Sequence, residues 1–302
     1  MSASRYHPDL LRFADEVGIE DAVAIAGGRT QWHTGGSLSG SPRLVAAPSG
    51  ILAYEPPEMT VRVLAGTPVA TLQAALAEAG QCANLIDVGG STVGGVLAVG
   101  WSAMTRLGWG PIRDSLLQAS YVSADGLIVT AGGPTVKNVT GFDLCRLLVG
   151  SHGTLGFLGE VILRTRPRPP LQRWLAGEAD PFALRDALYR PLTMLWDGRT
   201  TWVCLAGYPA DVAAETAVAI RFGLLDAPGP PTLPPYRWST TTEALRRETG
   251  VFVAEIGVGT VHRFEPPPAR PLDPVVSALQ DRLKANFDPT GRLNPGRDPR
   301  LP

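Results

Sequence analysis

The sequence predicts a mixed α+β fold, with two lobes followed by a small α+β cap that contains an antiparallel sheet. Short strand-like segments and amphipathic helices alternate along the chain, and Asp-Gly pairs between strand-like segments indicate hairpins. A proline-rich run at 166–170 separates a glycine-rich first part from a part richer in aromatic and charged residues. We expect a first domain over 1–168, with lobes over about 1–80 and 81–168. In the remainder, 169–302, the cap is expected to precede a C-terminal segment that returns to the first domain.

Composition excludes several classes of protein. The chain has 302 residues, of which 44% are hydrophobic and 18% charged, as in folded globular proteins. Its formal net charge of -1 gives no indication of the excess positive charge that binding to nucleic acid or to an anionic membrane requires. The N-terminus lacks a signal-peptide pattern and no apolar run approaches the roughly 20 residues that span a bilayer, so we expect a cytoplasmic protein, peripheral to a membrane only through a partner. The cysteines, at 82, 145 and 204, form no CxxC pair, so no disulfide framework, iron–sulfur site or zinc site is expected in this chain.

The first lobe is expected to begin with a short amphipathic helix over HPDLLRFADEVG. A buried strand at 22–26 then runs directly into the glycine-rich GGRTQWHTGG. Another strand at 59–65 leads through a glycine to a helix. For that helix the sequence predicts Thr67 as N-cap, Pro68 at the first position, Val69, Leu72 and Leu76 facing inward, and Gly80 just past the end.

The second lobe begins with a stretch dominated by glycine, serine and threonine at 87–114, which predicts loops around a short helix. The segment LLQASYVSADGLIVTAGG predicts a hairpin through Asp125 and Gly126. A short helix between glycines follows in TGFDLCRLLVGSHGTLG, and then a strand at 157–166.

The cap is expected to contain a second hairpin with an Asp-Gly turn, in LTMLWDGRTTWVCLAGY, followed by a helix in PADVAAETAVAIRFGLL. A loop at 227–236 and a strand at 251–259 come next. A closing helix has Asp273 as N-cap and Pro274 at its first position, with Val276, Leu279 and Leu283 on one face.

Two glycine-rich turns from different lobes are the clearest functional signal. They are GGRT at 27–30 and GGSTVGG at 89–95. Backbone N–H groups of such turns meet phosphate charge without bulky side chains, so two facing turns would form a cradle for a diphosphate. A single glycine pair is equally consistent with a plain turn. The GxGxxG fingerprint and the GxxxxGK[ST] loop are both absent, which argues against a Rossmann dinucleotide site and against a P-loop enzyme.

The order of motifs resembles a known family. The strand followed by GGRT, the helix AGTPVATLQAAL, the loop STVGGVLAVG, the IRD element and the segment TVKNVTGFDLCRLLVGSHGTLGFLGEVILRTRPRP are similar to the FAD-binding domain of the vanillyl-alcohol oxidase/p-cresol methylhydroxylase superfamily. Within it, these motifs and the terminal FDPTGRLNPGR most resemble the FAD-binding subunits of glycolate oxidase. The resemblance covers 20–168 and 285–297, is loose between them, and is most specific at 136–161.

The resemblance implies a set of cofactor-binding residues around FAD. The first flavin loop corresponds to Gly27, Gly28, Arg29 and Thr30, and the second to Gly89, Gly90, Ser91, Thr92, Gly94 and Gly95. Ser102, Arg106, Arg113 and Asp114 correspond to residues near the flavin or bracing its pocket, and Gly156, Glu160 and Val161 to the adenine end. Lys137, Asn138, Gly141 and Asp143 match a motif that supports the site.

The sequence departs from the family pattern at two places, and each departure predicts a structural difference from the family. Many members have a histidine after the paired glycines that bonds covalently to the flavin, whereas Arg29 follows Gly28 here. We therefore expect non-covalent FAD, with His33 as the alternative attachment point. The N-terminus begins at a helix, without the extended proline-containing segment that usually opens this domain, so the first lobe is expected to be one strand short.

The resemblance also implies a function, namely oxidation of a small 2-hydroxy acid of the glycolate or lactate type. The chain would oxidise it, or relay its electrons, within a complex containing a larger flavoprotein subunit and an iron–sulfur subunit. A non-catalytic, flavin-binding scaffold subunit and a reductase of the cell-wall sugar pathway are the alternatives. Such an oxidation needs a base or metal near the hydroxyl and a cation for the carboxylate. No metal site is predicted, and the candidate base is His262, near Glu255 and Arg263, which can equally be a satisfied polar histidine. Trp196 and Trp202 are expected to be core or interface aromatics and Cys145 a small apolar core residue.

Overall fold

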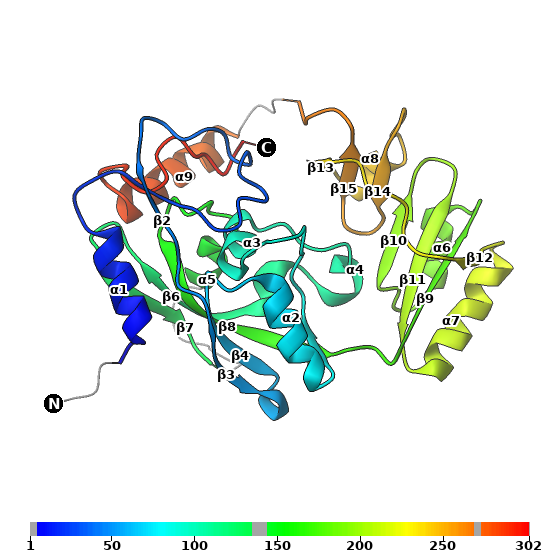
Figure 1. The fold of residues 1–302 in the computed structure, drawn as a ribbon. Helices are drawn as coiled ribbons and strands as arrows, with labels where there is room; N and C mark the ends of the chain where they lie inside the picture. Colours follow the sequence, from blue (N-terminus) through cyan, green and yellow to red (C-terminus); the bar gives the residue numbers. More distant parts are fainter. Residues whose placement is uncertain (1–4, 135–143, 269–272, 302) are drawn as a thin grey trace. The chain divides into compact units, whose positions relative to one another are not determined.

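The computed structural model describes residues 5–134, 144–268 and 273–301 and confirms the α+β class. The chain divides into two compact units. The first unit comprises Met1–Ser102, Ile112–Pro167 and Arg270–Pro302, and the second comprises Ala103–Pro111 and Arg168–Ala269 (Figure 1). The break after Pro167 falls in the proline-rich run. The sequence did not predict that residues 103–111 belong to the second unit.

The main sheet of the first unit has six strands in the order β3-β4-β8-β6-β7, with β5 also paired to β8, and every pairing is antiparallel. Because β4 pairs with β8, the lobe boundary expected near residue 80 falls inside one continuous sheet. The hairpin of β6 and β7 turns at Asp125 and Gly126 as predicted, with Gly126 at φ +75°. The strands are β3 (Ile51–Glu55), β4 (Thr60–Leu64), β5 (Gln81–Ala83), β6 (Leu116–Val122), β7 (Ile128–Gly132) and β8 (Phe157–Pro167).

A small parallel sheet joins the N-terminal region of the first unit to the C-terminal segment. It contains β1 (Val23–Ile25) and β2 (Arg43–Val45), and Leu293 bridges to Val23 in parallel. Asp288 is 2% exposed and accepts hydrogen bonds from the backbone N–H groups of Arg292 (3.1 Å) and Leu293 (2.8 Å). The guanidinium of Arg292 donates to three backbone carbonyls of the N-terminal and β6–β7 regions. These contacts hold the C-terminal segment beside β1.

The helices of the first unit are α1 (Pro8–Val17), α2 (Val69–Glu78), α3 (Val93–Val99), α5 (Leu144–Leu148) and α9 (Pro274–Phe287), with 3-10 turns at Pro56–Glu58 and Ile112–Ser115. The inward positions Val69, Leu72 and Leu76 of α2 are buried as predicted. The predicted N-cap is wrong, because Pro68 occupies that position without a side-chain bond. The hydroxyl of Thr67 is buried and instead donates to the carbonyl of Leu64 (2.7 Å).

Helix α9 begins as predicted, since the carboxylate of Asp273 accepts hydrogen bonds from the N–H groups of Val275 (2.8 Å) and Val276 (3.2 Å). No described residue of this helix is buried. Val276 and Leu279 are 50% and 55% exposed, so the apolar face seen in the sequence does not enter the core.

The second unit is built on a seven-stranded antiparallel sheet in the order β12-β9-β11-β10-β14-β15-β13. The hairpin of β10 and β11 and the helix after it are confirmed, and Trp196 packs in the core against Phe182 and Phe252. The strand predicted at 251–259 is too long, because Gly257 and Gly259, both at φ +79°, turn the chain back. The elements are β9 (Leu171–Gly177), β10 (Thr193–Trp196), β11 (Thr201–Gly207), β12 (Leu225–Ala227), β13 (Tyr236–Ser239), β14 (Val253–Glu255), β15 (Thr260–Arg263), α4 (Arg106–Trp109), α6 (Pro181–Ala187), α7 (Pro209–Arg221) and α8 (Thr242–Leu245).

Candidate functional site

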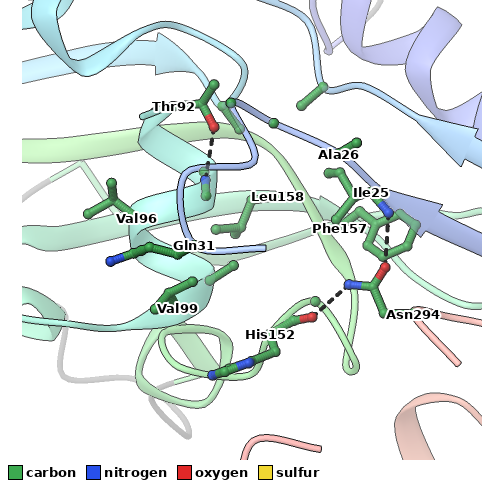
Figure 2. A pocket seen from close by; sticks show the side chains of 18 of the residues that line it. Ile25, Ala26, Gln31, Thr92, Val96, Val99, His152, Phe157, Leu158 and Asn294 are labelled. Carbon is green, nitrogen blue, oxygen red and sulfur yellow. Dashed lines mark hydrogen bonds between the residues drawn. The ribbon is translucent and has the colours of Figure 1, made fainter. Parts of the chain in front are cut away.

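A cavity of about 390 Å³ lies within the first unit, a size typical of small-molecule sites. Its walls come from segments that are far apart in the sequence (Figure 2). They are the loop at 25–34 after β1, the helix α3, the segment 148–158 that enters β8, and the C-terminal residues Asn294 and Arg297. The fold therefore brings both ends of the chain to one site.

The two glycine-rich loops meet at this cavity and pack backbone against backbone. A Cβ atom on Gly28 would lie 2.8 Å from the carbonyl carbon of Gly90 and would overlap its oxygen. A Cβ on Gly27 would overlap the side-chain oxygen of Thr92. The hydroxyl oxygens of Thr30 and Ser91 are 3.1 Å apart and share a hydrogen bond. Glycine is required at position 28 because its backbone approaches that of Gly90 too closely for any side chain.

The first loop presents unused hydrogen-bond donors. The N–H groups of residues 27–30 donate to no acceptor in the described ranges, and Arg29 has φ +55°. Successive N–H groups around a left-handed residue form a concavity that binds anions. By contrast, the N–H groups of Gly94 and Gly95 are taken by the carbonyl of Ala65 (2.7 Å) and by the Thr92 hydroxyl (3.2 Å). The first loop thus presents unused donors at residues 27–30, and the second loop packs against it through Gly90 and Ser91.

The polar cavity residues Asn294, His152 and Arg297 had no role assigned from the sequence. Asn294 accepts a hydrogen bond from the N–H of Ile25 (2.9 Å) and donates one to the carbonyl of His152 (2.6 Å), as Figure 2 shows. Burial lowers the pKa of His152, opposed by a hydrogen bond to the backbone of Thr34, while the nearby Arg297 lowers it further. The pKa of His152 therefore lies below its ordinary value, chiefly because of burial. The motif RLNPGR, which contains Asn294 and Arg297, was the available signal.

Of the residues that the resemblance assigned to FAD, eight line the cavity: Gly27, Gly28, Arg29, Thr30, Thr92, Gly94, Gly95 and Gly156. Gly90 and Ser91 lie behind the first loop and contact it, and Gly89 precedes them at φ +79°.

Other assigned residues of the first unit are not among those that line the cavity. The hydroxyl of Ser102 accepts a hydrogen bond from the N–H of Ile112 (3.1 Å). Arg113 and Asp114 are exposed on the 3-10 turn that begins at Ile112. Glu160 and Val161 are buried in β8, where the Glu160 carboxylate lies 2.6 Å from the Arg62 guanidinium. Lys137, Asn138, Gly141 and Asp143 fall outside the described residues.

Arg106 and the candidate base His262 both belong to the second unit. His262 is 4% exposed, and its Nε2 lies 2.8 Å from Oε1 of Glu255. The guanidinium of Arg237 reaches the same oxygen at 3.2 Å, while Oε2 of Glu255 has no partner within the described chain. His262 is thus a member of a buried charged cluster of the second unit.

The described residues contain neither a cluster suited to a metal ion nor a helix able to cross a membrane. No group of three or more histidine, cysteine, aspartate or glutamate side chains there is arranged to hold a metal ion. Among the same residues, no helix combines the length and apolar character that crossing a membrane requires.

Comparison with known proteins identifies the first unit. Residues 8–132 match the family model described as FAD binding domain. Glycolate oxidase subunit GlcE of Escherichia coli strain K12 is 35% identical over 202 residues, which cover 64% of this chain and 58% of that protein. D-lactate dehydrogenase of Archaeoglobus fulgidus is 40% identical over 99 residues, covering 32% of this chain and 22% of that enzyme. The chain thus spans less than two thirds of either relative.

Solved structures share the fold. Alkyldihydroxyacetonephosphate synthase superposes with a TM-score of 0.67 at 12% identity, covering 95% of this chain and 73% of that one. The grass pollen allergen Phl p 4, described as having glucose dehydrogenase activity, gives a TM-score of 0.51 at 14% identity over 71% of this chain and 46% of that one. Residues 8–132 thus match the FAD binding domain family, and the solved structures share the fold of this chain.

The residues at the cavity fit FAD. The loop at 27–30 offers peptide N–H donors to a diphosphate, and none of the residues that line the cavity is acidic. The side-chain Nε2 of Gln31 is buried and has no acceptor in the part of the chain that is described, so it is available to a ligand oxygen or ring nitrogen. These features are what a buried anionic dinucleotide requires.

Proposed function

We propose that this chain binds FAD non-covalently in the cavity and takes part in the oxidation of a small 2-hydroxy acid, as one subunit of a complex with a larger flavoprotein and an iron–sulfur subunit. The observation that carries the proposal is the meeting of two glycine loops around unused N–H donors, in a chain that contains an FAD binding domain. The location of such a complex in the cytoplasm stays a prediction from the sequence.

The chain's own residues would bind and orient the cofactor. The N–H groups of residues 27–30 would hold the diphosphate, and the close packing of Gly28 on Gly90 would fix the position of the loop. Asn294 joins β1 to the segment that carries His152, and residues of both line the cavity. When bound, FAD supplies the acceptor for the electron pair removed from the substrate.

Non-covalent attachment is supported by the placement of His33. The neighbours of His33, Trp32 and Thr34, line the cavity, whereas His33 is exposed and is not among the lining residues. His152 is the histidine among the lining residues, and it lies in the segment 148–158 rather than after the paired glycines. Acid precipitation of the purified holoprotein tests this part, because released flavin appears in the supernatant and covalently bound flavin stays in the pellet.

The substrate class comes from the names of relatives, a glycolate oxidase subunit and a D-lactate dehydrogenase, which this chain covers only in part. The test is anaerobic addition of glycolate or lactate to the holoprotein, with the flavin absorbance followed over time. Bleaching by the chain alone supports a catalytic subunit. Bleaching that occurs only after addition of partner subunits supports an electron relay, and flavin that is never reduced argues against both.

A scaffold that binds flavin without reducing it is the second candidate. It is favoured by His262, the candidate base, which is already engaged by Glu255 and is not one of the residues around the cavity. The test compares the complex assembled with this chain and with a variant that does not bind FAD. Equal turnover of the two complexes would support the scaffold, and loss of turnover with intact assembly would exclude it.

A further inference from the structure

The cavity carries positive charge without a carboxylate to balance it. Its lining residues include Arg29 and Arg297 and no aspartate or glutamate. Arg29 makes no hydrogen bond or ion pair with any residue that the structure describes. Arg297 donates to the backbone carbonyls of Thr34 (3.0 Å) and Gly36, and no carboxylate of the described chain forms an ion pair with it.

Trp32 holds both cations in place. The central guanidinium carbon of Arg29 lies 5.2 Å from the centroid of the Trp32 ring, and that of Arg297 lies 5.0 Å from it. Both distances fall within the range of a cation–π contact. Burial lowers the pKa of Arg297, because a partly desolvated charge that lacks a counter-ion is disfavoured.

Two like charges stacked on one ring repel each other, and the repulsion falls when an anion lies between or beside them. A diphosphate carries one negative charge on each phosphate, so its two charges equal in number the positive charges of the two guanidinium groups. Arg29 also belongs to the loop whose N–H groups are unused, so charge and hydrogen-bond donors are presented from the same segment. Peptide N–H groups alone would bind the phosphates without neutralising them.

We infer that Arg29 and Arg297, positioned by Trp32, are the counter-charges of the diphosphate of the bound dinucleotide. The inference rests on the proposed binding of FAD in this cavity and adds to it the residues that supply the charge. It implies that FAD affinity in this chain depends on ionic strength, since part of the binding free energy is electrostatic.

The test is the dissociation constant of FAD for the FAD-free protein, measured by flavin fluorescence at low and high salt. The variants Arg29→Gln and Arg29→Lys differ in charge at a side chain that has no hydrogen bond to break, so folding is preserved. Arg297→Gln and Arg297→Lys form a second pair. Arg282→Gln is the control, because it removes an equal charge from an exposed position of α9 outside the cavity.

We expect Arg29→Gln to weaken FAD binding by about 10- to 100-fold at low salt, the range for a lost charge-assisted hydrogen bond, and to make the affinity less sensitive to salt. Arg29→Lys should retain most of the affinity, and Arg282→Gln all of it. Equal affinities for the Gln and Lys variants at both positions would overturn the inference and leave the proposed function standing. Failure of the unmodified chain to bind FAD would overturn both.

Discussion

Replacing Gly28 by alanine tests whether the two glycine loops must touch. The added Cβ would lie 2.8 Å from the carbonyl carbon of Gly90 and closer still to its oxygen, whereas ordinary contacts are 3.4 Å or longer. Both partners are backbone, so no side-chain rotation relieves the overlap and the loops must separate. Overpacking of this kind costs about 1–3 kcal/mol.

Because the separated loop no longer presents its N–H groups together, we expect Gly28→Ala to weaken FAD binding by about 10- to 100-fold, equivalent to about 1.4–2.8 kcal/mol. The assay is calorimetric titration of the FAD-free protein with FAD, together with thermal unfolding of the same sample. Gly229→Ala is the matched control, since a Cβ at that position has no atom within 4 Å. FAD binding by Gly28→Ala that equals that of the unmodified chain would refute the cradle.

Three further predictions concern stability. Asp288→Ala removes a buried acceptor of two backbone N–H groups and should lower the free energy of unfolding by about 3 kcal/mol in urea titrations, whereas a loss under 1 kcal/mol would contradict the role of the C-terminal segment. The pKa of His152 is lowered on folding, so its contribution to stability is present above the ordinary value of 6.5 and is lost as pH falls below it. His152→Asn, which tolerates the φ of +52°, should flatten that part of the stability profile, and an unchanged slope would contradict this. Glu255→Ala leaves Arg237 and His262 buried without their carboxylate, so we expect a loss of about 3 kcal/mol by thermal unfolding, and a melting temperature within a degree of the original would argue against the cluster.

Features that depend on neighbouring residues were predictable from the sequence. The hairpin at Asp125 and Gly126, the capping of α9 by Asp273 and the inward face of α2 follow from turn chemistry, capping and periodicity within a few residues. The glycine loops were recognisable for the same reason, because residues that lack a Cβ mark places where backbone approaches backbone or a ligand.

Features that depend on contacts between distant residues were not predictable from the sequence. Thr67 is not the N-cap of α2, because its hydroxyl donates a hydrogen bond to the carbonyl of Leu64 in a buried turn. The apolar face of α9 stays exposed, although the spacing of its residues is that of a core-facing helix. Periodicity shows which residues share a face but not whether another element covers it.

The residues of the cavity also fall into those predictable from the sequence and those that only the tertiary structure brought together. By itself, the sequence determined the two glycine loops, the α+β class and the resemblance to FAD-binding proteins, all of which reside in local patterns. Only the tertiary structure brought Asn294 to Ile25, across 269 residues of sequence, and placed His152 and Arg297 in the same cavity. The reason is that a hydrogen bond between such distant residues depends on how the whole chain packs, and a local pattern does not record it.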